Sequence, residues 1–128
     1  MNVWIVTQGR GARRFIERLA ADESIHVNPA MERKGLETIL KDPKLCAEMD
    51  ALIIHGDVLV RATWVDPELI GQLKLLSFWK EKVEVILFFT NKRTESSLRR
   101  FASGFRFVAH PADPGDLYEQ VKALAVRS

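Results

Sequence analysis

The sequence predicts a single α/β domain with a doubly wound, five-stranded parallel sheet. Short runs of apolar and β-branched residues alternate along the chain with stretches whose apolar residues recur at helical spacing. This strand–helix unit is repeated five times, which is typical of parallel sheets with helices on both faces and right-handed crossovers. At 128 residues, the chain has the length of one domain that folds without a disulfide or a metal.

The amino-terminal part of the chain supplies two strands and the helix between them. Residues 3–7 are apolar and β-branched, and a glycine-containing segment after them leads into a helix over residues 12–22. The apolar residues of that helix share one face. Residues 24–28 form the second predicted strand, which we expect Pro29 to end.

The middle of the chain holds a helical stretch, a buried strand and a longer helix. Helical spacing extends over residues 35–49, and Pro43 breaks or kinks this stretch because proline lacks a backbone N–H donor. The continuous apolar run over residues 51–54 is typical of a strand covered on both faces. Asp66 is then the expected cap of a helix over residues 67–79, whose first position suits proline.

The last part of the chain completes the alternating pattern. Residues 83–90 form the clearest strand, and residues 95–101 form a short basic helix with Leu98 and Phe101 turned inward. Residues 105–109 form the fifth strand. The last helix begins at an Asp-Pro pair. Its expected buried face consists of Leu117, Val121, Leu124 and Ala125.

Composition and charge exclude several classes of protein. Hydrophobic residues make up 47% and charged residues 28% of the chain, which suits a globular domain and not a disordered one. The net charge of +2 is too small to imply nucleic-acid binding by itself. The single cysteine, Cys46, cannot form an internal disulfide, and no stretch reaches the roughly 20 apolar residues of a membrane span. We therefore expect a cytoplasmic protein.

A functional site is expected at the carboxyl edge of the sheet, where open parallel sheets bind their ligands. In this chain the loops at that edge begin near Thr7, His55, Thr90 and His110. The two histidines have an ordinary interpretation as residues that form local hydrogen bonds. A zinc site would need further ligands, so we expect no metal there.

The second half of the chain carries a resemblance to a known family. A strand that ends in Thr90 precedes a strand that contains the aromatic Phe107 and ends at His110-Pro111. Together with the five strand–helix units, these features resemble the receiver domains of two-component response regulators. The resemblance covers nearly the whole of residues 1–128, which we treat as one receiver-like domain, and it implies the CheY-like, or flavodoxin-like, fold.

The residues of the phosphorylation pocket depart from that family. Receivers hold magnesium with acidic residues after the first strand, where this chain has Thr7 and Gln8. The phosphorylated aspartate would fall on His55, with Asp57 as the only fallback acceptor. Since magnesium prefers carboxylate oxygens and phosphoryl transfer needs its charge offset, the sequence resembles an atypical receiver, or pseudo-receiver, without a cofactor. The degenerate pocket comprises Thr7, Gln8, His55, Asp57, Thr90 and His110, the last in the place of the family's lysine.

The resemblance implies a non-catalytic regulatory or protein-interaction module. Receivers dimerise or contact their outputs through the surface of the helix over 95–101, the strand over 105–109 and the last helix. Atypical receivers are often fused to a larger effector, including ParA/MinD-like ATPases of pilus assembly, so we expect a protein partner, a fused effector or a second copy. The ordinary interpretation of this surface is a solvated helix face. Its candidate contact residues are Arg99, Arg100, Arg106, Phe107, Tyr118 and Lys122.

Two other functions stay open. The first is a small-anion or nucleotide sensor, because a helix amino terminus and neighbouring glycines accommodate phosphate. Solvated side chains around a tight turn are the ordinary alternative. The second is a small α/β enzyme, although no acid–base or nucleophile pair stands out at the carboxyl edge. We find no nucleic-acid recognition motif. The candidate anion-binding residues are Arg10, Arg13, Arg61, Lys92 and Arg93.

Overall fold

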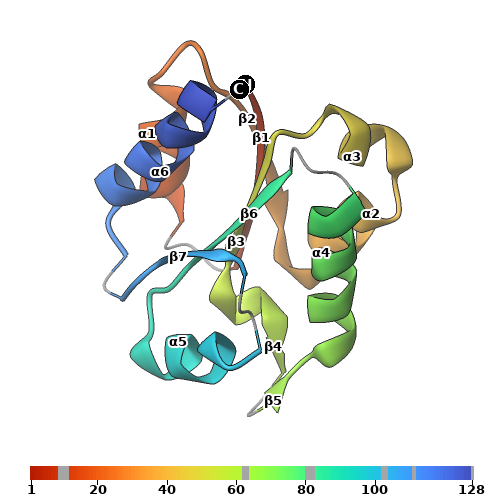
Figure 1. Cartoon of the computed structure of the whole chain (residues 1–128). Helices are drawn as coiled ribbons and strands as arrows, with labels where there is room; N and C mark the ends of the chain where they lie inside the picture. Colours follow the sequence, from red (N-terminus) through yellow and green to blue (C-terminus); the bar gives the residue numbers. More distant parts are fainter. Residues whose placement is uncertain (9–11, 62–63, 80–82, 102–103, 111, 128) are drawn as a thin grey trace.

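The fold is described by a computed structural model that covers residues 1–8, 12–61, 64–79, 83–101, 104–110 and 112–127, with the backbone alone for 61, 64, 77–79 and 125–127. Five strands form one parallel sheet in the order β2–β1–β3–β6–β7 (Figure 1). This order confirms the predicted doubly wound sheet. The strands are β1 (Asn2–Thr7), β2 (His26–Met31), β3 (Ala51–His55), β6 (Glu84–Phe88) and β7 (Arg106–Val108).

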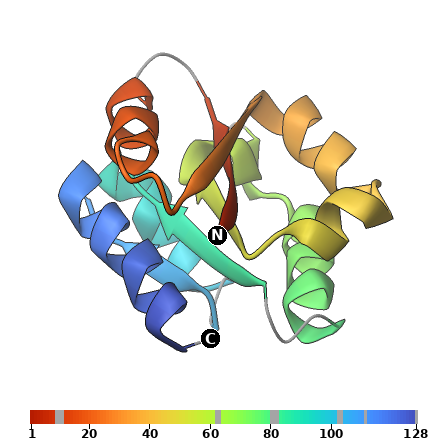
Figure 2. The same cartoon turned by 90° about the horizontal axis from the view of Figure 1, so that it is seen from above.

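Helices cover both faces of this sheet. Figure 2 shows α1 and α6 on one face and α2, α3 and α4 on the other. No helix in the described part of the chain is long and apolar enough to cross a membrane. The helices are α1 (Arg13–Ala20), α2 (Glu32–Leu40), α3 (Pro43–Glu48), α4 (Pro67–Trp79), α5 (Lys92–Arg99) and α6 (Pro114–Arg127).

The central strand β3 explains why its sequence is apolar without alternation. All its residues are buried, and successive side chains point to opposite faces of the sheet. Leu52 and Ile54 belong to the core under α2 and α4, whereas Ala51 and Ile53 belong to the core under α1 and α6. A strand with two covered faces is apolar on both sides, as the strand is over residues 51–54.

The second strand differs from its prediction. We expected Pro29 to end it, but β2 continues through Pro29 to Met31, and Pro29 is in register with Ile5 of β1. The reason is that β2 is an edge strand with a neighbour on one side only. Proline is tolerated there because the missing N–H donor removes no hydrogen bond on the open side.

A small insertion between β3 and α4 was not predicted. A 3₁₀ turn, η1 (Gly56–Leu59), leads into an antiparallel hairpin of β4 (Val60–Arg61) and β5 (Trp64–Val65). Figure 1 shows this insertion and α5 at the end of the sheet away from the chain termini. The segment that we treated as a loop therefore builds part of the carboxyl edge.

The helix boundaries follow from capping side chains. Pro43 divides the predicted helical stretch as expected, and α3 starts there with Asp42 accepting hydrogen bonds from backbone N–H groups at its first turn. The helix α5 begins earlier than predicted because Asn91 caps it. Leu98 is buried as expected, but Phe101 is 50% exposed because it lies beyond the end of α5.

Candidate functional site

The carboxyl ends of neighbouring strands bring the central part of the predicted pocket together. Thr7 ends β1, His55 ends β3, and Thr90 follows β6. Asp57 lies in η1 and not on a continuation of β3, because the chain turns directly after His55. The turn still leaves the Asp57 carboxylate beside His55.

His55 is the centre of this site. It is 6% exposed, and its ring stacks on Phe88 with a centroid separation of 5.0 Å. Its Nε2 atom lies 2.9 Å from the Thr90 hydroxyl and 3.5 Å from Asp57 Oδ2. Its Nδ1 atom is buried and makes no hydrogen bond of normal geometry with a described residue. One ring nitrogen is therefore shared by two polar groups, and the Gln8 backbone is a further polar neighbour of the ring.

Burial decides the charge of this imidazole. Desolvation lowers the pKa of His55 below its ordinary value of 6.5, because the charged form loses hydration in the core. The Asp57 carboxylate and, more weakly, the backbone of Gln8 act in the opposite direction on the pKa. His55 is therefore neutral at neutral pH, and its Nε2 atom shares a hydrogen bond with the Thr90 hydroxyl.

Two hydrogen bonds fix the first turns of α5 to this edge. The Thr94 hydroxyl donates to Asp57 Oδ1 at 2.9 Å, which ties α5 to η1. Glu95 is buried, receives a hydrogen bond from the His110 backbone and pairs with Arg99 at 2.7 Å. These contacts lower the pKa of Glu95, with the Arg99 hydrogen bond as the main cause. The sequence alone singled out neither Thr94 nor Glu95, since their partners are 37 and 15 residues away.

Thr7, Gln8 and His110 make fewer side-chain contacts within the predicted pocket than His55 and Asp57 do. Thr7 is buried and its hydroxyl donates to the Met31 sulfur at 3.7 Å, while Gln8 is exposed. The His110 side chain is exposed, so His110 joins the site through its backbone.

The described donors do not fit the magnesium ion that receivers hold. Magnesium requires a near-octahedral set of hard oxygen ligands and is usually bound through one or two carboxylates together with waters and substrate phosphates. At this edge Asp57 is the carboxylate beside His55, and its Oδ1 atom already accepts from Thr94. The neighbouring Thr7 hydroxyl is directed to Met31.

The candidate anion-binding residues are only partly placed. Arg10 and the Arg61 side chain lie outside the described part of the chain. Arg13 is exposed on α1 and pairs with Glu17 at 2.9 Å. Lys92 and Arg93 are exposed at the start of α5 and form no ion pair with a described side chain.

The candidate contact residues fall into two groups. Arg99, Arg100, Arg106 and Phe107 lie on α5 and β7, or directly after α5. The Arg99 guanidinium lies 5.2 Å from the centre of the Phe107 ring. Arg106 is paired with Glu84 at 3.5 Å, and Arg100 is exposed without an ion pair among the described side chains.

A groove of about 350 Å³ lies between the edge strand β7 and α6. Gln120 donates a hydrogen bond of 2.9 Å to the Phe107 carbonyl and so covers one acceptor of the open strand edge. The groove is lined by Arg106, Phe107, Val108, Ala109, Asp116, Glu119, Gln120 and Ala123.

Tyr118 and Lys122, the other candidate contact residues, face a different part of the molecule. The Tyr118 hydroxyl donates to Asp22 at 2.5 Å, and Lys122 pairs with the same carboxylate at 3.0 Å. Arg18 lies over the Tyr118 ring at 3.9 Å. Both residues therefore join α6 to α1 and the turn before β2.

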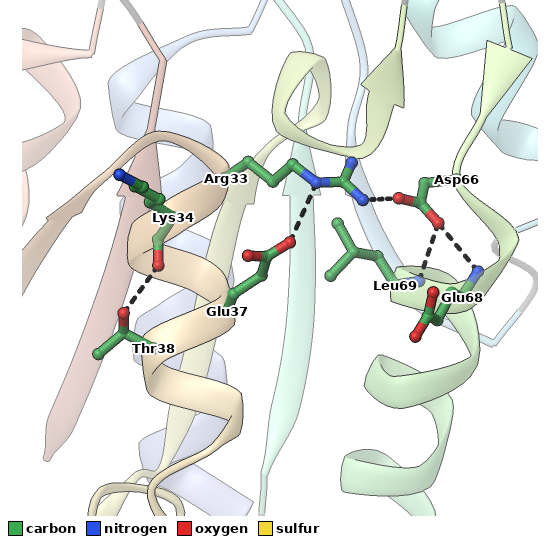
Figure 3. A network of polar contacts seen from close by, with 7 residues as sticks. All are labelled: Arg33, Lys34, Glu37, Thr38, Asp66, Glu68 and Leu69. Carbon is green, nitrogen blue, oxygen red and sulfur yellow. Dashed lines mark hydrogen bonds and ion pairs between the residues drawn. The ribbon is translucent and has the colours of Figure 1, made fainter.

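A second polar network, which the sequence did not reveal, links α2 to α4. Figure 3 shows the Arg33 guanidinium between Glu37 and Asp66, with Asp66 turned toward the first turn of α4. Asp66 is buried, caps α4 by accepting from the Glu68 and Leu69 backbones at 3.0 and 3.3 Å, and pairs with Arg33. The cap was predicted from the sequence, but its ion pair was not. The network holds together the two helices on that face near the carboxyl edge.

Comparison with known proteins identifies the fold. No protein-family model matches the sequence, and no curated protein matches it. Solved structures do match. A protein assigned to pilus assembly (cpaE) from Burkholderia thailandensis is 18% identical, with 98% of each chain covered and a TM-score of 0.68.

Two solved response regulators also match this chain over nearly its whole length. The receiver domain of RcsB from Salmonella enterica serovar Typhimurium, solved with a phosphomimetic beryllofluoride, is 20% identical over 98% of this chain and 88% of that one, with a TM-score of 0.67. The chemotaxis response regulator CheY4 of Vibrio cholerae is 16% identical over 96% and 97%, with a TM-score of 0.63. The chain described above thus has the CheY-like fold of response-regulator receiver domains.

Proposed function

We propose that this chain is a regulatory module that works through protein contacts and does not use an aspartyl phosphate. The observation that carries the proposal is the state of the pocket. The position expected for the phospho-acceptor holds the buried His55, which is bonded to Thr90, and the nearby Asp57 is bonded to Thr94. The fold supports a signalling role, and the polar contacts argue against phosphoryl transfer as its trigger.

The chemistry of phosphoryl transfer makes this argument specific. The transferred group needs positive charge around its oxygens, normally from a metal ion and a cationic side chain. The imidazole beside Asp57 is neutral at neutral pH because burial lowers its pKa. The His110 side chain, which stands in the place of the family's lysine, is exposed. A phosphoryl group on Asp57 would therefore lack its usual support.

Incubation with acetyl phosphate and magnesium, followed by intact-protein mass spectrometry, tests the proposal. We expect the wild-type protein to gain no phosphoryl group. The matched control is Asp57→Asn, which should behave identically. A phosphoryl adduct on the wild type that is lost in Asp57→Asn would overturn the proposal.

The surface that would carry the output is formed by α5, β7 and the groove-facing side of α6. Arg100 adds an exposed positive charge beside α5, and Asp116 and Glu119 add negative charge on the exposed side of α6. Such a surface is self-complementary across a two-fold axis, because the basic end of one copy faces the acidic end of the other. We propose a second copy as one partner of this surface, and a fused or separate effector domain as its output.

Charge reversal tests the dimer. Arg100→Glu and Glu119→Arg should each raise the dimer dissociation constant measured by analytical ultracentrifugation. The double variant should recover part of the loss, since opposite charges meet again across the axis. Lys74→Glu, an exposed change on α4, is the control and should leave the constant unchanged. A wild-type protein that stays monomeric at all concentrations would contradict the dimer, although not the absence of phosphorylation.

A small-anion sensor is a second candidate function, favoured by the exposed Lys92 and Arg93 at the start of α5. Backbone amides at a helix amino terminus attract anions, and nearby cations add to this attraction. Calorimetric titration with phosphate and nucleotides should then show salt-dependent binding that Lys92→Ala and Arg93→Ala weaken. Lys74→Ala, an exposed change on α4, is the matched control. Lack of binding in the wild type would exclude the sensor.

A further inference from the structure

We propose that protonation of His55 moves the Asp57 carboxylate toward the imidazole and weakens its hydrogen bond to α5, so that pH regulates the position of α5. The proposal rests on the proposed function only in taking the α5 surface as the output. Its geometric basis is independent of any partner. His55, Asp57 and Thr94 form a chain of contacts from the end of β3 to the first turn of α5.

The two oxygens of Asp57 serve different elements. Oδ1 accepts the Thr94 hydroxyl of α5 at 2.9 Å, and Oδ2 lies 3.5 Å from His55 Nε2 at the end of β3. The first distance is that of a hydrogen bond, whereas the second is beyond a normal one. The Asp57 side chain is 36% exposed, so solvent leaves it room to move. Asp57 is therefore held by α5 and only approached by His55.

The proton on the imidazole decides which contact is stronger. Neutral imidazole has one donor and one acceptor nitrogen, and an Nε2 acceptor takes the Thr90 hydroxyl at 2.9 Å. In the protonated form both nitrogens donate, and a donor on Nε2 finds the Asp57 carboxylate as its anionic partner. Hydrogen bonds between two charged groups are shorter and stronger than neutral ones. The Thr90 hydroxyl can accept as well as donate, so it does not block this change.

The other groups around His55 leave Asp57 as the anion that responds. From β6 the ring faces Phe88 and Thr90, which carry no charge, and from β1 it faces the Gln8 backbone. On α5, Glu95 is turned to Arg99 and the His110 backbone, and Lys92 and Arg93 are exposed. Among the described residues, Asp57 is the charged group whose interaction raises the pKa of His55.

The backbone of Gln8 also favours the protonated imidazole. Its hydrogen bond with the ring raises the pKa of His55, as does the Asp57 carboxylate. These two groups offset part of the desolvation that favours the neutral ring, so the charged form has polar partners from two different segments.

An NMR pH titration tests the proposal without a partner. The ring signals of His55 and the backbone amides of Thr94 and Glu95 are followed from neutral to acidic pH, in a protein that carries His26→Gln and His110→Gln to remove the other histidines. We expect the α5 amides to titrate with the same midpoint as His55. In Asp57→Asn the His55 midpoint should fall, and the α5 response should disappear. In Thr94→Val, which breaks only the α5 contact, the midpoint should rise while the α5 response shrinks.

The outcomes separate this proposal from the proposed function. Amides of α5 that ignore the His55 titration, or that respond equally in Asp57→Asn, would overturn the switch even if the protein dimerises and lacks phosphorylation. A matched titration of His55 and α5 would support the switch even if the partner surface is located elsewhere.

Discussion

Two polar clusters at opposite ends of the sheet differ in how completely their hydrogen bonds are satisfied. At the amino edge, Asp22 accepts hydrogen bonds from the Ser24 backbone and hydroxyl and from Tyr118, and it pairs with Lys122. At the carboxyl edge, His55 Nε2 is shared between Thr90 and the more distant Asp57, and Asp57 is bonded to α5 through one oxygen. The amino-edge cluster fastens α6 to the rest of the fold, whereas the carboxyl-edge cluster can rearrange.

Among the changes considered, removal of the Phe88 ring beneath His55 should lower the stability of the fold most. Phe88 is fully buried and contacts Phe15 and His55, with centroid separations of 4.6 and 5.0 Å. Phe88→Ala should lower the free energy of unfolding by about 3–5 kcal/mol, because it leaves a cavity in the core. Urea denaturation measures the loss. The pKa of His55 should also rise toward its ordinary value, since water reaches the ring; an unchanged pKa would contradict desolvation as its main cause.

The Asp66 network should give the next largest effect. Asp66→Ala removes the cap of α4 and leaves Arg33 without its buried partner. We expect a loss of about 2–3 kcal/mol in the free energy of unfolding, less than for a fully buried pair because Arg33 is partly exposed. Asp66→Asn keeps an oxygen acceptor for the cap and should lose less. Equal losses in the two variants would show that the cap contributes nothing, because Asp66→Asn removes only the ion pair.

Acid should distinguish the two clusters in different pH ranges. The hydrogen bonds from Ser24 and then Tyr118 hold the pKa of Asp22 well below its ordinary value of 3.8. Because the folded pKa is the lower one, Asp22 stabilises the fold above pH 3.8, and this contribution is lost as the pH falls further. Below pH 3.8, the melting temperature of Asp22→Asn should therefore fall less with decreasing pH than that of the wild type. A parallel decline would place the acid sensitivity elsewhere.

His55 should affect the stability of the fold at a higher pH than Asp22 does, and by a smaller amount. The pKa of His55 in the folded protein lies below 6.5. Between that pKa and 6.5, the unfolded chain therefore binds more protons than the folded one. Stability should fall as the pH drops below 6.5 toward the folded pKa. His55→Gln cannot take up a proton and should flatten this slope in thermal melts. A slope that is the same in His55→Gln would contradict burial of the neutral imidazole as its cause.

The exposed Arg13–Glu17 pair should give the smallest effect. Both side chains are largely in solvent, at 86% and 61% exposure. Arg13→Ala should change the free energy of unfolding by less than about 0.5 kcal/mol, because solvent screens exposed pairs. Chemical denaturation in low and high salt measures the change. A loss larger than that of Asp66→Asn would mean that Arg13 has a contact not recognised in the fold.

The sequence correctly predicted those strands and helix starts that are determined by a few neighbouring residues. The continuous apolar run of β3 reflects burial on both faces, and the caps Asp66 and Asp113 bond to backbone N–H groups two and three residues further on. Such signals are contained within a few neighbouring residues. The extension of β2 through Pro29 depended on β2 being an edge strand, which only the complete sheet order reveals.

The sequence predicted only those residues of the site that lie at the ends of strands. The placement of His55 and Thr90 at neighbouring strand ends followed from the parallel sheet, and they are hydrogen-bonded. The Thr94–Asp57 and Tyr118–Asp22 hydrogen bonds join residues 37 and 96 positions apart. No periodic pattern encodes such pairs, because they depend on how η1, α5 and α6 pack against the sheet.

The central claim, that this receiver fold works without an aspartyl phosphate, is tested most directly by thermal unfolding with magnesium and beryllofluoride. Beryllofluoride mimics the aspartyl phosphate, and a ligand that binds only the folded state raises the melting temperature. The account predicts the same melting temperature with and without beryllofluoride, for the wild type and for Asp57→Asn. A rise in the wild type that Asp57→Asn abolishes would contradict it and would make Asp57 a working phospho-acceptor.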